Sequence, residues 1–167
     1  RNYAALLSSL KLEPEDKKRI GYLLDYASVV EAAGDIISKR LLPLAEQKHR
    51  DSQRFSKQGH DEIHLLHSKS IDNLNLCRNL LLSNSFGAAK NLFEQKQEFS
   101  ALYRKSRKKH LKRLAEGKVS SISSSDLHLD VCLAFKDFNS RISSVAHAVL
   151  SAEGYFTDAF PETLLRQ

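Results

Sequence analysis

The sequence predicts an all-α fold, an antiparallel bundle of four long helices joined by short loops. Only six glycines and three prolines occur among 167 residues, and several segments with helical periodicity exceed twenty residues. Apolar residues in these segments recur at alternating steps of three and four, which places them on one face of a helix. Nothing in the pattern indicates a strand. A chain of this length buries a substantial core within one domain.

The first predicted helix spans residues 14–48. Pro14 suits the first turn of a helix, whereas Pro43 lies inside it and predicts a kink near residues 39–42, because proline removes a backbone donor. We expect one apolar stripe to organise the packing of the bundle, formed by Ile20, Leu23, Ala27, Val30, Gly34, Ile37, Leu41 and Leu44.

Two further helices follow, over residues 56–83 and 88–116. The helix over residues 56–83 carries an apolar stripe. The helix over residues 88–116 should end at Gly117, because glycine is common just past helix ends. The stripe of the first consists of Ile63, Leu66, Leu74, Cys77 and Leu81.

A serine-rich connector over residues 118–125 leads to the last helix. Ser123 and Asp126 have the spacing of a capping box, and the helix should end near Gly154. Its apolar face is formed by Leu127, Val131, Phe135, Phe138, Ile142, Val145 and Val149. The predicted organisation is an N-terminal segment (1–13), the bundle (14–153) and a C-terminal tail (154–167).

Composition limits the classes of protein that fit. No apolar run is long enough to span a bilayer, and no signal-peptide pattern opens the chain. Cys77 and Cys132 show no CxxC spacing and fall inside predicted helices, which indicates buried thiols in a reducing compartment. The chain starts Arg-Asn-Tyr and contains no methionine. We therefore expect it to be part of a longer protein.

Carboxylates offer a candidate metal site. Glu31 and Asp35 lie one turn apart on the first helix, and Asp130 and Asp137 share a row on the last. If the bundle brings these rows together, Glu31, Asp35 and Asp130 could hold a divalent or iron-type metal ion. Lysines offer an alternative that we favour, in which Lys96 pairs with Glu31 or Asp35 inside the bundle and Lys136 neighbours the carboxylates of the last helix.

The histidines do not indicate an enzyme. His60, His64 and His67 lie on one face, and His60 and His64 have the spacing of the HExxH zinc motif. The residue after His60 is aspartate, however, one methylene shorter than the glutamate that acts as general base in that motif. No nucleophile motif and no glycine-rich phosphate loop occurs, so the sequence predicts a non-catalytic protein without a cofactor.

Cations crowd the end of the third helix. Seven within ten residues exceed what the helix dipole accounts for. Anionic lipid headgroups and an acidic protein partner are candidate ligands. A single interleaved aromatic, Tyr103, and the absence of a reading motif argue against nucleic acid. We assign a docking role to Arg104, Lys105, Lys108, Lys109, Lys112 and Arg113, while Arg107 belongs to the same cluster.

Several spaced motifs resemble PhoU-like domains. Val30-Glu31-Ala32-Ala33-Gly34-Asp35 is similar to the LERIGD helix of that family. The remaining matches, over roughly residues 15–150, are Phe55–Gly59, His110–Leu114 with Gly117, His128–Asp130, Phe138–Ile142 and Ser144–Ala146. Together they resemble the cytosolic C-terminal region of bacterial sodium/phosphate cotransporter family proteins.

The resemblance implies a regulatory bundle on the cytoplasmic side of the bacterial inner membrane, beside the transmembrane domain of a phosphate transporter. A homodimer and contact with anionic lipid are further expectations. Stand-alone PhoU proteins bind metal clusters through E/DxxxD pairs, of which only Glu31 and Asp35 remain here. Lys136 and Ser140 occupy the corresponding acidic positions of the last helix, and Lys96 another. The resemblance therefore implies a regulator whose metal site is mostly replaced by cations, with a metal-binding regulator of phosphate uptake as the alternative.

Overall fold

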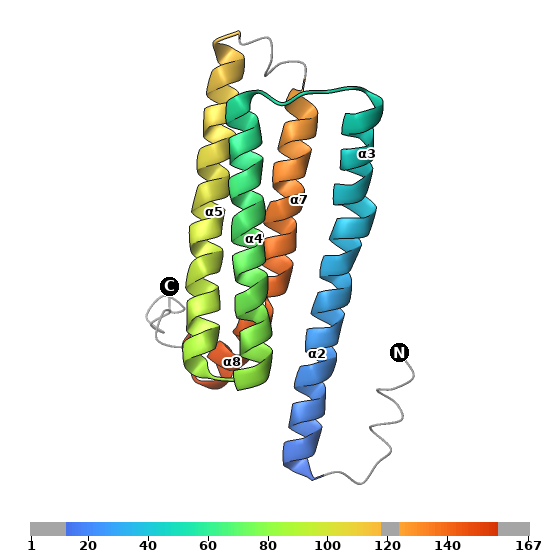
Figure 1. Ribbon diagram of the computed structural model, residues 1–167. Coiled ribbons are helices and arrows are strands. Elements are labelled where there is room, and N and C mark those ends of the chain that lie inside the picture. Colours follow the sequence, from blue (N-terminus) through green and yellow to red (C-terminus); the bar gives the residue numbers. More distant parts are fainter. Residues whose placement is uncertain (1–12, 118–123, 157–167) are drawn as a thin grey trace, which may run out of the picture.

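The computed structural model describes residues 13–117 and 124–156 and is all-α, as predicted (Figure 1). Its helices form four antiparallel rods. The first combines α2 (Pro14–Ile36), η1 (Ile37–Leu41) and α3 (Leu42–Arg50). The others are α4 (Lys57–Ser83), α5 (Phe86–Ala115), and α7 (Ser125–Ser143) followed by α8 (Val145–Ala152).

Proline shapes the first rod where the sequence predicted it would. Pro14 begins α2, and a π-helical turn, Ile37–Leu41, ends two residues before Pro43, near the start of α3. In this turn the amide of Leu42 donates to the carbonyl of Ile37. Because Pro43 has no amide proton, the turn before it cannot keep a regular hydrogen-bond ladder. A kink was predicted near residues 39–42, and the structure has a π-helical turn over Ile37–Leu41.

Serine side chains begin two of the helices. The hydroxyl of Ser56 accepts from the Gly59 amide at 3.2 Å, and that of Ser85 accepts from the Ala88 amide at 3.3 Å. These bonds satisfy amides that a helix N-terminus leaves free. At the other end of α5, Gly117 has φ +70°, the left-handed conformation that glycine adopts at little cost.

Two predicted details of the last helix differ from the structure. The residue before α7 is Ser124, and its side chain makes no capping bond; the predicted partner of Asp126 in a capping box, Ser123, lies outside the described residues. The helix also breaks at Ser144, so that α8 forms a separate segment. Gly154, the predicted end, has φ +75°.

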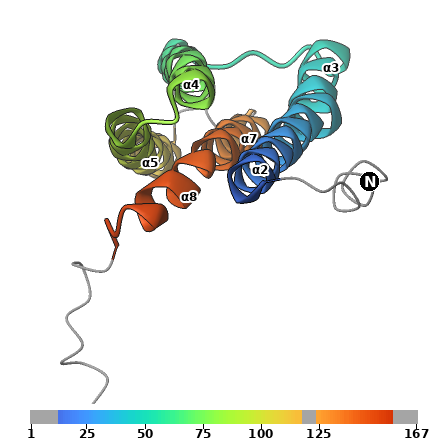
Figure 2. The same ribbon diagram turned by 90° about the horizontal axis from the view of Figure 1, so that it is seen from below.

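The core lies between α4, α5, α7 and α8, with α7 in contact with every other rod (Figure 2). The larger cluster gathers Leu80, Leu92, Ile142 and Leu150, and a smaller one contains Leu66, Phe99 and Cys132. Most of the predicted stripe of the last helix is buried here. On α4, Leu66 and Cys77 are buried as predicted, whereas Leu74 is 38% exposed.

The stripe of the first rod does not face the core, so the expectation that it organises the packing was wrong. Leu23, Val30 and Ile37 are 46%, 46% and 49% exposed. The bundle is contacted instead by Tyr22, Tyr26, Val29 and Ile36, and Ala33 is buried against it. The tyrosine rings cover more area than a stripe that contains alanine and glycine, so helical period alone did not identify the covered face.

Within residues 13–117 and 124–156, no helix is both long and apolar enough to cross a membrane.

The packing of the core predicts that substitutions at two nearby leucines of α4 differ sharply in their effect on stability. Leu80 is completely buried, whereas Leu82 is 78% exposed. We expect Leu80→Ala to lower the free energy of unfolding by about 2–5 kcal/mol, because it leaves a cavity. Leu82→Ala should change it by less than about 0.5 kcal/mol. Urea denaturation followed by circular dichroism measures both, and equal effects would contradict the packing described.

Candidate functional site

Charged and polar side chains are buried at one end of the bundle, where α4 begins, α5 ends and α7 begins (the upper end in Figure 1). We call Glu62, His110, Arg113 and His128 the polar end cluster. His110 and His128 are each only 2% exposed, and Arg113 is 6% exposed. Such groups are costly to bury unless they satisfy one another, so their contacts determine what this end of the bundle can do.

A bidentate ion pair joins α4 to α5 within this cluster. Both terminal nitrogens of Arg113 donate to the two carboxylate oxygens of Glu62 at 2.8 Å. Burial alone would raise the pKa of Glu62, but the hydrogen bonds from Arg113 and His128 lower it to about 2. The same pair raises the pKa of Arg113. Both groups therefore stay charged at neutral pH.

Two stacked imidazoles connect this ion pair to α7. The rings of His110 and His128 lie 4.5 Å apart at 13°. The guanidinium of Arg113 approaches His110 Nδ1 at 3.4 Å, and an arginine can only donate. Neutral His110 therefore carries its proton on Nε2 and donates it to the Ser125 hydroxyl at 3.0 Å. Burial lowers the pKa of His110, and His128 and Arg113 lower it further.

Close packing encloses His128. Its Nε2 lies 3.4 Å from Glu62 Oε2 and 3.8 Å from Cys132 Sγ, and the ring of Phe55 meets it edge-on at 5.9 Å. A side chain at Gly59 would place its Cβ 3.1 Å from the imidazole. Glycine at this position therefore allows α4 to approach α7.

The chemistry of the cluster favours a structural role. Both carboxylate oxygens of Glu62 are bound to Arg113, so the carboxylate is not free to act as a base. Burial raises the pKa of Cys132 to about 12, and the negative charge of Glu62 adds to this effect. The thiol is thus protonated at neutral pH and a poor nucleophile. We interpret the cluster as a clamp that fixes the end of α5 against α4 and α7.

Just outside this clamp, α5 presents a basic surface to solvent. Its predicted members are exposed except Arg113, whose side chain is 8% exposed and paired with Glu62. Arg113 is therefore unavailable for docking, and assigning it to the docking surface was wrong. We define the basic face as Arg104, Lys105, Arg107, Lys108, Lys109 and Lys112.

The predicted carboxylate site is dispersed. Glu31, Asp35 and Asp130 are all exposed, and Asp35 pairs with Lys39, one turn along its own helix, at 2.7 Å. In the part of the chain that the structure describes, no three side chains of histidine, cysteine, aspartate or glutamate are gathered to hold a metal ion.

The ion pairs inside the bundle differ partly from those predicted. Asp137 binds Arg40 at 2.7 Å and Lys136 at 3.1 Å. Burial opposes the charge of Asp137, but hydrogen bonds from these two cations lower its pKa. The ammonium of Lys96 lies 6.0 Å from the centre of the Phe93 ring and not against Glu31 or Asp35, so that predicted pairing was wrong.

The predicted histidine face lies on the outside of α4. His60, His64 and His67 are exposed. The rings of His60 and His64 stack at 6.5 Å, and His67 meets the ring of Phe135 edge-on at 5.9 Å. His60 Nδ1 also lies 3.8 Å from the carboxylate of the next residue, Asp61.

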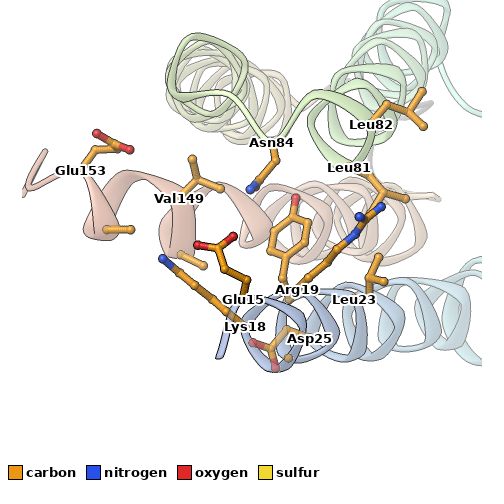
Figure 3. A pocket seen from close by; sticks show the side chains of 14 residues that line it. Glu15, Lys18, Arg19, Leu23, Asp25, Leu81, Leu82, Asn84, Val149 and Glu153 are labelled. Carbon is orange, nitrogen blue, oxygen red and sulfur yellow. The ribbon is translucent and has the colours of Figure 1, made fainter. Parts of the chain in front are cut away.

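A cavity of about 740 Å³ lies at the opposite end of the bundle, between α2, the end of α4 and α8 (Figure 3). Leu81 and Leu82 line one side, while Glu15, Lys18 and Arg19 extend from α2, and Asp25 and Glu153 add negative charge. With both signs of charge around one opening, the cavity favours no ligand of a particular charge.

Comparison with known proteins gives one group of relatives. The chain is 30% identical over 148 residues to a Salmonella typhimurium protein named "Putative inorganic phosphate export protein YjbB". Proteins of the same name from Escherichia coli K12 and Shigella flexneri are 28% identical over 148 residues. The alignments cover 89% of this chain but 27% of each relative, so the chain spans about a quarter of their length. No family model and no solved structure matches the chain.

Sequence reasoning missed Glu62, although a signal for the cluster was present. Along α5, Leu92, Phe99, Ser106, His110 and Arg113 are buried, and they follow one another at helical spacing. The buried row that begins at Leu92 and Phe99 therefore continues through polar residues. A cation on such a stripe requires a buried carboxylate, and Glu62 supplies it.

The clamp can be tested with a double-mutant cycle. We expect Glu62→Leu and Arg113→Met each to lower the free energy of unfolding by about 3–5 kcal/mol, because each leaves its partner charged and buried. The double variant should lose less than the sum of the two, because neither charge then remains. Chemical denaturation measures all four proteins, and additive effects would contradict a direct pair.

Stability should also depend on pH through Glu62. Its pKa falls from a usual 4.5 to about 2 on folding. The contribution of Glu62 to the free energy of unfolding is therefore complete above about pH 4.5. It is lost as the pH drops through about 2, by about 3 kcal/mol in total. Glu62→Gln should flatten this part of the profile. The lowered pKa of His110 adds a separate loss that begins as the pH falls below 6.5.

Proposed function

We propose that the chain is a non-catalytic regulatory domain of a protein that transports inorganic phosphate. The carrying observation is the alignment of 89% of the chain to proteins named for phosphate export. The family resemblance seen in the sequence supports the same role. In the clamp, the buried charges of Glu62 and Arg113 pair with each other. This pairing supports a role in binding rather than in catalysis.

We further propose that the domain lies beside a transmembrane domain on the cytoplasmic side of the bacterial inner membrane. The basic face of α5 suits this position because the cytoplasmic leaflet is negatively charged, and each lysine near it contributes about 1 kcal/mol. The clamp beneath holds the end of α5 in one place, so that its cations approach the membrane as a fixed array.

Two versions of this proposal differ in the direction of phosphate transport and in its coupling to sodium. The resemblance indicates sodium-coupled transport, whereas the names of the relatives indicate export. The two differ in the direction of phosphate movement and its dependence on a sodium gradient, so radioactive phosphate flux distinguishes them in cells that express the complete gene product.

The basic face predicts a specific loss of membrane binding. Lys108→Glu, Lys109→Glu and Lys112→Glu, combined, should weaken binding to vesicles that contain phosphatidylglycerol by about 100-fold or more, since three favourable contacts become unfavourable. A matched control reverses three exposed lysines elsewhere, Lys17, Lys57 and Lys90, and should keep most of the binding. Vesicle sedimentation at low and high salt measures both.

In cells, the same triple variant of the complete gene product should change phosphate flux or its response to external phosphate, and the control variant should not. Flux that is unchanged in the triple variant, and also unchanged after removal of residues 13–156, would overturn the regulatory role. Vesicle binding that survives the triple reversal would overturn the docking surface alone.

A further inference from the structure

One exposed leucine lies among the cations of the basic face. Leu111 is 48% exposed, near the end of α5. Arg104, Arg107 and Lys108 precede it by seven, four and three residues, and side chains at these spacings share one face of a helix. All three are exposed. A single exposed leucine is ordinary on a protein surface, but a leucine surrounded by cations joins an apolar and a charged surface in one place.

The cations and the apolar residues lie at different levels along α5. Five of the six cations of the basic face precede Leu111 in the chain. Leu111 lies two turns beyond Arg104, or about 10 Å further along the helix axis. Leu114, which is half-buried, and Ala115, which is exposed, follow it toward the helix end. The end of α5 is therefore partly apolar, and most of its positive charge lies on the turns before it.

The first half of α5 has no such surplus of cations. Glu94 and Glu98 are exposed there, and Lys90 lies 3.9 Å from the carboxylate of Glu94. An anionic surface attracts clustered cations and repels carboxylates. Contact with such a surface is therefore limited to the second half of the helix, which includes Leu111.

We propose that Leu111 is an apolar anchor, which enters the acyl boundary of an anionic membrane while the basic face binds the headgroups. This inference rests on the proposed docking of the basic face and adds the depth of that contact. Interfacial segments of peripheral proteins combine lysine and arginine with leucine in this way. Long cationic side chains reach the headgroups while a neighbouring apolar residue lies deeper. An acidic protein loop would pair with the cations, but it would not require an exposed leucine among them.

Tryptophan fluorescence tests the insertion, because the chain contains no native tryptophan. Leu111→Trp places one indole at the proposed anchor. We add vesicles of phosphatidylglycerol and phosphatidylcholine in equal parts. The emission should shift to shorter wavelength, and lipids brominated in the acyl chain should quench it. The matched control is Leu42→Trp on α3, because Leu42 is 54% exposed and α3 lies across α7 from α5 (Figure 2). Its emission should stay unchanged.

Leu111→Ala measures the contribution of the anchor to affinity without a change in charge. We expect binding to the same vesicles to weaken about fivefold, because the exposed half of a leucine side chain no longer leaves water. This factor should persist at high salt, since salt screens the contacts of the cations but not apolar burial. Leu42→Ala should bind like the unchanged chain. Circular dichroism verifies that all four variants are folded.

The outcomes separate the anchor from the docking surface. Vesicle binding that needs the basic face, with the indole of Leu111→Trp still in water and Leu111→Ala not weakened, would overturn the anchor alone. Absence of vesicle binding at low salt would overturn both. In cells, a photoreactive residue at position 111 of the complete gene product should crosslink to lipid. Crosslinks to protein alone would overturn the anchor and indicate an acidic protein partner.

Discussion

The buried ion pair between Glu62 and Arg113 is the constraint on which the upper end of the bundle depends. It joins α4 to α5, and the stacked rings of His110 and His128 extend the contact to α7. A buried charge pair adds little stability compared with apolar packing, but the loss of either partner is costly. Its main consequence is therefore geometric, because the bidentate ion pair and the stacked rings can form only when the three helices keep this arrangement.

Other polar contacts act in the same way further along the bundle. The amide of Asn73 donates to the side-chain oxygen of Asn139 at 2.6 Å inside the core, and Arg40 binds Asp137 between the first rod and α7. Apolar residues between these points tolerate small shifts along a helix, whereas paired polar groups do not. The register of α4 and of the first rod against α7 is thus set by a few specific bonds in a mainly apolar bundle.

The sequence predicted the helices well because their limits depend on local chemistry. Pro14, Ser56, Ser85 and Gly117 act through the residues next to them, and each lies at or beside a helix end in the structure. Which face of α2 is covered depends on the shape of its neighbours, and no local signal reveals it. The partner of Arg113 lies 51 positions away along the chain. Arg113 stands at helical spacing from the buried Phe99 and Ser106, but from the sequence we assigned it to the docking surface, and only the folded bundle identifies Glu62 as its partner.

The clamp also explains how one run of cations can serve two purposes. Helical geometry turns Arg113 inward, where it neutralises Glu62, while Lys108, Lys109 and Lys112 point to solvent. Because burial fixes Arg113, the exposed lysines are held on a rigid helix end, and a rigid array loses less conformational entropy on binding than a mobile one.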